Sequence, residues 1–90
     1  MLSQREKVTD GSRARAIALF NDNLKFRLKQ KGTTTFASRH EALGVLTEEF
    51  NELVDAVKSN NEIEFEQELI DIMVGAYWVL ASSINRSMDW

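Results

Sequence analysis

Apolar residues recur along this chain at the spacing of one face of an α-helix. The first stretch of this kind covers residues 12–31. Its apolar stripe consists of Ile17, Phe20, Leu24 and Leu28. Asp10 or Ser12 can cap its start, and Gly32 follows a basic last turn, which is a usual stop signal. The pattern therefore predicts a first helix over residues 12–31.

A second helical pattern covers residues 38–59. It begins with Ser38, and Glu41 three residues later completes a capping box, in which two side chains satisfy free backbone N–H groups of the first turn. Its apolar stripe consists of Leu43, Leu46, Phe50, Leu53, Val54 and Val57. Asn60 interrupts the pattern, and Asn61 is suited to cap a following helix. We expect a second helix here and a short turn after it.

The third predicted helix covers residues 62–85 and is apolar on nearly every side over residues 69–84. Such a helix must be covered on every side, and two other helices of one short chain do not suffice. We therefore expect an all-α protein with three main helices and one domain over residues 1–90. Its antiparallel hairpin would pair with a partner chain into a four-helix-bundle-like core, in a homo-oligomer that is a dimer or a tetramer.

Composition narrows the possible functions. Hydrophobic residues make up 43% and charged residues 28%, which is ordinary for a soluble domain. The chain has no cysteine and one histidine, His40, so thiolate sites and sites with two histidines from one chain are excluded. A net charge of −3 argues against binding of a nucleic-acid polymer. Neither a signal peptide nor a membrane span is visible, and we expect a cytoplasmic protein.

Two acidic pairs stand out, one on each of the last two predicted helices. They are Glu49 with Glu52, and Glu68 with Asp71. The i, i+3 spacing places each pair on one helical face. Glu52 and Glu68 each lie eight residues from the turn at Asn60, and the outer members each lie eleven residues from it. At about 1.5 Å per residue, these levels are ~12 Å and ~16 Å from the turn, so four carboxylates converge if the two faces meet.

Converging carboxylates indicate a metal site. Without a counter-charge they would repel one another and raise one another's pKa, and a divalent cation relieves this repulsion. Oxygen ligands without histidine or cysteine suit Mg²⁺, with Mn²⁺ as a substitute. Asp71 interrupts an otherwise apolar run, and a buried carboxylate is costly unless it is paired or binds a metal. The alternative is a solvated charged face, which such pairs often form on exposed helices.

The acidic pattern resembles the signature of a known enzyme superfamily. It consists of Glu-Glu-x-x-Glu, 15 residues, and Glu-x-x-Asp. Over residues 39–81 it is similar to the MazG-like branch of the all-α nucleoside-triphosphate pyrophosphohydrolases. The resemblance implies an oligomeric, Mg²⁺-dependent enzyme that hydrolyses a (d)NTP to (d)NMP and pyrophosphate, commonly to clean the nucleotide pool. It implies as metal ligands Glu49, Glu52, Glu68 and Asp71. Within the catalytic pair Glu48 and Glu49, it implies that Glu48 is a further ligand or the base that orients the attacking water.

Four more residues are candidates for contact with the substrate. They are Lys31, Arg39, Trp78 and Arg86. Lys31 ends a run with Lys25, Arg27 and Lys29, and these cations either complement the helix dipole or clamp phosphates. Arg39 lies about ten residues before the acids, ~15 Å along the helix, which suits the base or sugar rather than the metal. Trp78 can stack a nucleobase, although core or interface packing is commoner for such a side chain. Arg86 is the cation that follows the last helix.

Two other functions stay open on these grounds. Phosphoribosyl-ATP pyrophosphohydrolase has similar acidic helices, but in that family a histidine generally follows the final aspartate within about one turn, and residues 72–75 contain none. A non-catalytic helical oligomer or regulatory protein that retains the fold is the alternative from another class. A ferritin-like di-iron bundle is excluded, because it needs Glu-x-x-His motifs that the sequence lacks. The preferred base and sugar also stay open.

Overall fold

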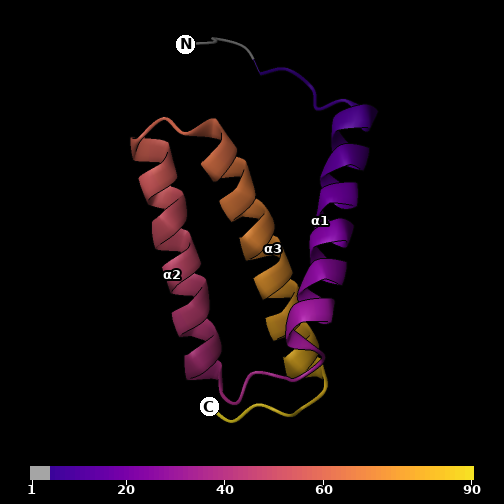
Figure 1. The fold of residues 1–90 in the computed structure, drawn as a ribbon, viewed down its shortest axis with the longest axis vertical. Coiled ribbons are helices and arrows are strands. Elements are labelled where there is room, and N and C mark those ends of the chain that lie inside the picture. The colour runs from indigo at the N-terminus through magenta and orange to yellow at the C-terminus, as the bar shows by residue number, and fades with distance from the viewer. Residues whose placement is uncertain (1–4) are drawn as a thin grey trace.

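The computed structural model describes residues 5–90, and its fold is all-α. Its three helices are α1 (Asp10–Lys31), α2 (Arg39–Lys58) and α3 (Glu62–Ile84) (Figure 1). These bounds agree with the predicted ranges to within two residues, and the described part of the chain contains no strand. Residues 1–4, which the single-domain prediction also covers, lie outside the described residues.

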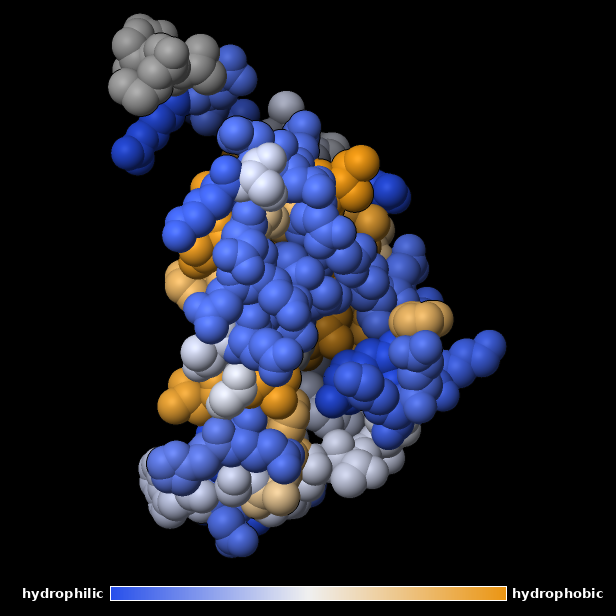
Figure 2. All heavy atoms as spheres, turned by 60° about the vertical axis from the view of Figure 1, so that its left-hand side comes forward, coloured by the Kyte–Doolittle hydropathy of each residue, from blue (hydrophilic) through white to orange (hydrophobic). Residues whose placement is uncertain are grey.

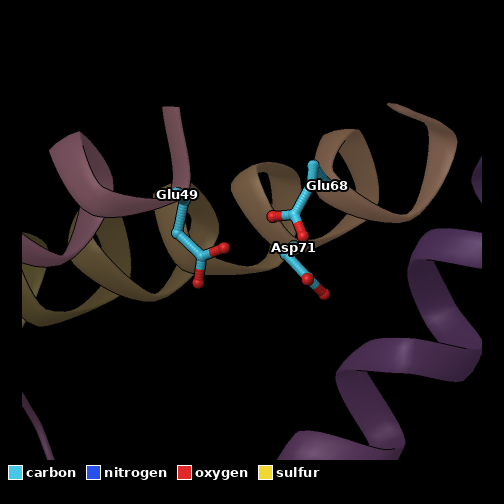
Figure 3. Close-up of side chains that lie close together, drawn as sticks. All are labelled: Glu49, Glu68 and Asp71. Carbon is cyan, nitrogen blue, oxygen red and sulfur yellow. The ribbon is translucent and has the colours of Figure 1, made fainter. Parts of the chain in front are cut away.

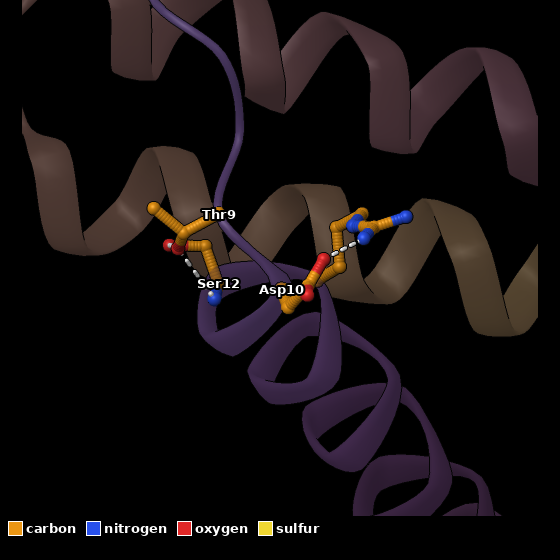
Figure 4. A network of polar contacts seen from close by, with 4 residues as sticks. Thr9, Asp10 and Ser12 are labelled. Carbon is orange, nitrogen blue, oxygen red and sulfur yellow. Dashed lines mark hydrogen bonds and ion pairs between the residues drawn. The ribbon is translucent and has the colours of Figure 1, made fainter.

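The start of α1 differs from the prediction. Thr9, rather than Asp10 or Ser12, is the N-cap, and its hydroxyl accepts a hydrogen bond of 3.1 Å from the backbone N–H of Ser12 (Figure 4). Asp10 instead lies in the first turn, where its negative charge interacts favourably with the positive end of the helix dipole. It also forms an ion pair with Arg13. Three residues that commonly cap helices lie within positions 9–12, so the local pattern alone could not distinguish between them.

The other caps follow the predicted chemistry. The hydroxyl of Ser38 accepts a hydrogen bond from the N–H of Glu41, and the carboxylate of Glu41 accepts one from the N–H of Ala37. The side chain of Asn61 accepts a bond of 3.0 Å from the N–H of Glu64 and caps α3. Between these helices Asn60 has a positive φ of 55°, a conformation that asparagine adopts more readily than most residues. The turn between α2 and α3 is thereby tightly defined.

The helices α2 and α3 form an antiparallel hairpin, and α1 packs against α3 but not against α2 (Figure 1). Within the hairpin, Gly75 of α3 faces Leu46 of α2, and a Cβ atom at Gly75 would lie 3.3 Å from the Leu46 side chain. Only a residue without a side chain fits this approach without displacing its neighbour. The close contact lies one turn beyond Asp71, so it also holds the two acidic helix faces near each other.

The C-terminal tail folds back onto the start of α2. The N–H of Arg39 donates to the carbonyl of Asp89 over 2.7 Å, and the N–H of Asp89 donates to the carbonyl of Ala37 over 3.0 Å. The guanidinium of Arg39 stacks on the ring of Trp90 at 4.0 Å and donates to the carbonyl of Met88. These contacts fasten the tail beside the N-terminus of α2, at the end of the hairpin away from its turn.

The described chain buries few apolar side chains. Those that are fully buried are Ala42, Ala56, Val74 and Met88, and α1 contributes none. Larger apolar residues remain exposed along the hairpin, with Leu43, Phe50 and Val57 on α2 and Met73, Leu80 and Ile84 on α3. Figure 2, in which the side with α2 is turned forward, shows a mainly hydrophilic face with apolar side chains along its margins. The core of one chain is therefore small.

Candidate metal centre

Three carboxylates from two helices converge in the middle of the hairpin. Glu49 comes from α2, while Glu68 and Asp71 come from α3 (Figure 3). One oxygen of each lies within 4.8 Å of the others. The antiparallel hairpin brings these levels together, as the equal distances from the turn predicted. This group is called the carboxylate cluster below.

Glu68 is the buried member of the cluster, with 8% of its surface exposed. Its Oε2 atom is shielded from solvent and has no hydrogen-bond partner among the described residues. Burial, then the neighbouring carboxyl group of Glu52, then the charge of Asp71 and the carboxyl group of Glu49, raise the pKa of Glu68 to about 7. An unpaired buried carboxylate oxygen costs free energy, so this side chain is better suited to a bound cation than to an empty site.

The other two members of the cluster are half-buried. Burial, followed by the charge of Asp71, raises the pKa of Glu49 above its ordinary value. Asp71 is oriented by Gln67, whose amide Nε2 donates a hydrogen bond of 3.1 Å to Oδ1 of Asp71. Sequence reasoning missed Gln67, although its position four residues before Asp71 places it on the same face of α3. A donor of this kind fixes a ligand carboxylate in one orientation.

The cluster fits a hard divalent cation. Its donors are all carboxylate oxygens, the ligand type of Mg²⁺, Mn²⁺ and Ca²⁺. Burial, and after it the charges of the neighbouring carboxylates, raise the pKa values of Glu49 and Glu68, so the charged forms of these groups are disfavoured and repel one another. A cation would remove this repulsion and would supply a partner for the buried Oε2 of Glu68. The residues of the cluster therefore suit a divalent cation.

Two predicted acidic residues lie beside the cluster rather than in it. Glu52 is exposed, and its carboxyl group is near enough to Glu68 to raise the pKa of that side chain. Glu48 is also exposed, and its charge contributes to the raised pKa of Glu49. Both therefore act on the cluster electrostatically, and their roles as ligand or base stay predictions.

The four predicted substrate contacts lie in different places. Lys31 lines a cavity of about 320 Å³ together with Glu49 and Asp71. The guanidinium carbon of Arg27 lies over the ring of Trp78, 4.5 Å from the centre of that ring. Arg39 and Arg86 line a different cavity with Met88, near the C-terminal tail. The structure thus brings Lys31 to the carboxylate cluster and separates it from the arginine pair.

Sequence analysis had grouped Arg27 with the other cations at the end of α1. In the structure, Arg27 and Lys31 line the cavity of the carboxylate cluster, whereas Lys25 and Lys29 are exposed and do not. The spacing of Arg27 and Lys31 in the sequence already indicated that they lie together, since residues four apart share one face of a helix. Which face would meet the cluster depended on the packing of α1 against α3.

These features define an all-α protein with a candidate divalent-cation centre built from carboxylates on a helical hairpin. The described part of the chain has no helix with the length and apolarity needed to cross a membrane. The family model of the MazG nucleotide pyrophosphohydrolase domain matches residues 37–89, and the chain belongs to this family. The match includes both acidic motifs and the C-terminal tail, and confirms the resemblance inferred from them. No curated protein and no solved structure matches the chain.

Proposed function

We propose that this protein is a Mg²⁺-dependent nucleoside-triphosphate pyrophosphohydrolase, which converts (d)NTP and water to (d)NMP and pyrophosphate. The observation that carries the proposal is the convergence of Glu49, Glu68 and Asp71 within 4.8 Å in a chain of the MazG family. An enzyme of this kind would help to clean the cytoplasmic nucleotide pool. Hydrolysis of the anhydride bond between the α and β phosphates needs positioning, charge neutralisation and an activated water, and it needs no side-chain nucleophile.

The acidic residues divide these tasks in the proposal. The residues that would hold the metal are Glu49, Glu52, Glu68 and Asp71. When bound, Mg²⁺ neutralises phosphate charge and lowers the pKa of coordinated water, and Mn²⁺ can replace it. Glu48, adjacent to Glu49 and exposed to solvent, accepts the proton of the attacking water at a carboxylate oxygen. Gln67 holds Asp71 in its orientation through the 3.1 Å hydrogen bond.

The reaction is tested with purified protein, Mg²⁺ and each common NTP and dNTP, with pyrophosphate and orthophosphate measured separately. We expect Mg²⁺-dependent release of pyrophosphate that Glu49→Gln and Asp71→Asn reduce by at least about a hundredfold, because each removes a charged ligand of the cation that would neutralise the reacting phosphates. Glu66→Gln, an exposed position on α3, is the matched control and should retain activity. Orthophosphate as the main product, or equal activity in all variants, would contradict the proposed reaction.

We also propose that the protein acts as a homo-oligomer, with a dimer as its smallest unit. The support is the exposed apolar stripes of the hairpin, in particular Leu43, Phe50 and Val57 on α2. These residues are seven apart in sequence, so they form one line along the helix, and a second copy would cover them. Light scattering coupled to gel filtration tests this proposal, and a monomer over the micromolar range would contradict it.

A further inference from the structure

The cavity beside the carboxylate cluster has walls of opposite charge. Glu49 and Asp71 line it from the hairpin, and Arg27 and Lys31 line it from the last two turns of α1. In Figure 3, α1 passes beside the cluster. The volume of the cavity, about 320 Å³, lies at the lower end of the range for small-molecule sites. An occupant of this cavity would contact the cations and the carboxylates at the same time.

Arg27 is held in the cavity wall by aromatic side chains of α3. Its guanidinium lies over the ring of Trp78, at 4.5 Å from the ring centre. That ring is itself fixed, because Trp78 Nε1 donates a hydrogen bond of 2.8 Å to the carbonyl of Thr34. About two turns earlier on α1, the ring of Phe20 packs edge-on against that of Tyr77, with the ring centres 5.5 Å apart. The cation is therefore positioned by packing and does not depend on an ion pair.

The guanidinium of Arg27 donates no hydrogen bond to another group of residues 5–90. Its Nη1 atom is shielded from solvent and has no hydrogen-bond partner among the described residues. Burial lowers the pKa of Arg27 below its ordinary value. Among residues 5–90, the ion pair within 4.0 Å is that of Arg13 with Asp10, so the carboxylates across the cavity do not neutralise Arg27. A guanidinium left in this state is costly, and an anion in the cavity would supply the missing acceptor.

We propose that Arg27 binds the phosphate chain of the substrate, with Lys31 one turn further along α1 as a second contact. The inference rests on the proposed function, and it assigns the phosphate-binding cations to α1 rather than to the C-terminal tail with Arg86. The planar guanidinium offers two parallel N–H donors, which match two oxygens of a phosphate group. Carboxylates on one wall and cations on the other suit a ligand made of a divalent cation and polyphosphate. Trp78 then positions Arg27 and need not stack a base.

The experiment measures binding of inorganic pyrophosphate in the presence of Mg²⁺ by calorimetry, next to pyrophosphate release from nucleotides. Arg27→Met keeps an unbranched side chain over Trp78 and removes the charge. Lys29→Met is the matched control, because it makes the same change of charge two residues away, on a part of α1 that does not line the cavity. Arg27→Lys keeps the charge and loses the paired donors. Circular dichroism and gel filtration establish that each variant keeps the native fold and assembly.

We expect Arg27→Met to weaken binding by about ten- to a hundredfold, the loss expected for one or two charge-assisted hydrogen bonds. The affinity of Arg27→Lys for pyrophosphate should lie between that of Arg27→Met and that of the wild type. Lys29→Met should bind pyrophosphate within about twofold of the wild type, since an exposed charge is screened. Trp78→Leu should weaken binding partway, because it removes the surface that positions the guanidinium.

Each possible outcome separates this inference from the proposed reaction. Equal binding by Arg27→Met and Lys29→Met would overturn the inference, and the wild-type release of pyrophosphate would still stand. No binding by the wild type would also overturn it. Selective loss of binding in Arg27→Met, without nucleotide hydrolysis by the wild type, would support the phosphate site and overturn the reaction instead.

Discussion

Replacing Glu68 by glutamine should stabilise the metal-free protein. Glu68 is buried, and its pKa of about 7 lies above the ordinary value of 4.5. The native state therefore binds a proton more tightly than the unfolded state, and stability falls as pH rises from about 4.5 to about 7. Above this window the carboxylate is charged in both states and its destabilising effect is complete. Glutamine has nearly the same shape and carries no charge at any pH.

The size of the effect follows from the shift in pKa. A change from 4.5 to about 7 corresponds to about 3 kcal/mol at alkaline pH. Because the cluster borders a cavity that admits solvent, screening lowers this value, and we expect Glu68→Gln to raise the free energy of unfolding by about 1–2 kcal/mol at about pH 8. Near pH 5 the gain in the free energy of unfolding should shrink to roughly a quarter of its value at about pH 8, since the carboxyl group of Glu68 is then protonated in the native state.

The assay is urea unfolding followed by circular dichroism, with a chelator present and with the protein concentration held constant, because an oligomer's apparent stability depends on it. Glu66→Gln, which is exposed on α3, should leave stability within about 0.5 kcal/mol of the wild type. Adding Mg²⁺ should stabilise the wild type more than Glu68→Gln. A loss of stability in Glu68→Gln at about pH 8, or an equal gain at both pH values, would refute the reasoning.

Four further predictions follow from the same structure. Mg²⁺ binding measured by calorimetry should weaken by about tenfold per pH unit below pH 7, because the proton on Glu68 must leave; affinity that does not vary with pH would contradict this. Gly44→Ala should raise the free energy of unfolding by about 0.5–1 kcal/mol, since nothing lies within 4 Å of the new Cβ in the chain, and a loss would indicate that a second copy covers this position. Gly75→Val should lower it by about 1–3 kcal/mol in the same urea assay, because its side chain meets Leu46; unchanged stability would mean that the helices separate freely. Leu80→Glu should shift the assembly toward monomer in gel filtration with light scattering, since Leu80 is 60% exposed in one chain, and an unchanged mass would exclude this face from the interface.

Periodicity and capping residues were sufficient to predict the three helices, because both are local properties of the chain. The hairpin followed as well, since a turn near Asn60 sets the levels of Glu49 and Asp71 without knowledge of any other contact. Level alone, however, did not determine which carboxylates meet. Glu52 shares the level of Glu68 but lies outside the group of three, because the rotation of each helix about its axis also matters.

The parts of the site that sequence reasoning missed depend on contacts between distant segments. Arg27 and Trp78 are 51 residues apart in sequence, and their stacking depends on where α1 crosses α3. Arg39 lies close to the acids along the chain, yet its side chain bonds to Met88 in the C-terminal tail. Neither contact leaves a periodic pattern, so residue spacing predicted that carboxylates of the two helices converge but could not predict the surroundings of the basic residues.

Because the C-terminal tail is hydrogen-bonded to the start of α2, the two ends of the hairpin segment lie side by side. Ala37 and Asp89, which share a hydrogen bond, stand at the two boundaries of the segment that the family model matches. Units whose ends lie side by side can be inserted into a longer chain, or duplicated, without separating their helices. On this architecture the carboxylate cluster belongs wholly to the hairpin, whereas the proposed phosphate-binding cations belong to α1. Under the proposal for Arg27 and Lys31, substitutions in α1 would alter the binding of phosphate and leave the carboxylates of the hairpin in place.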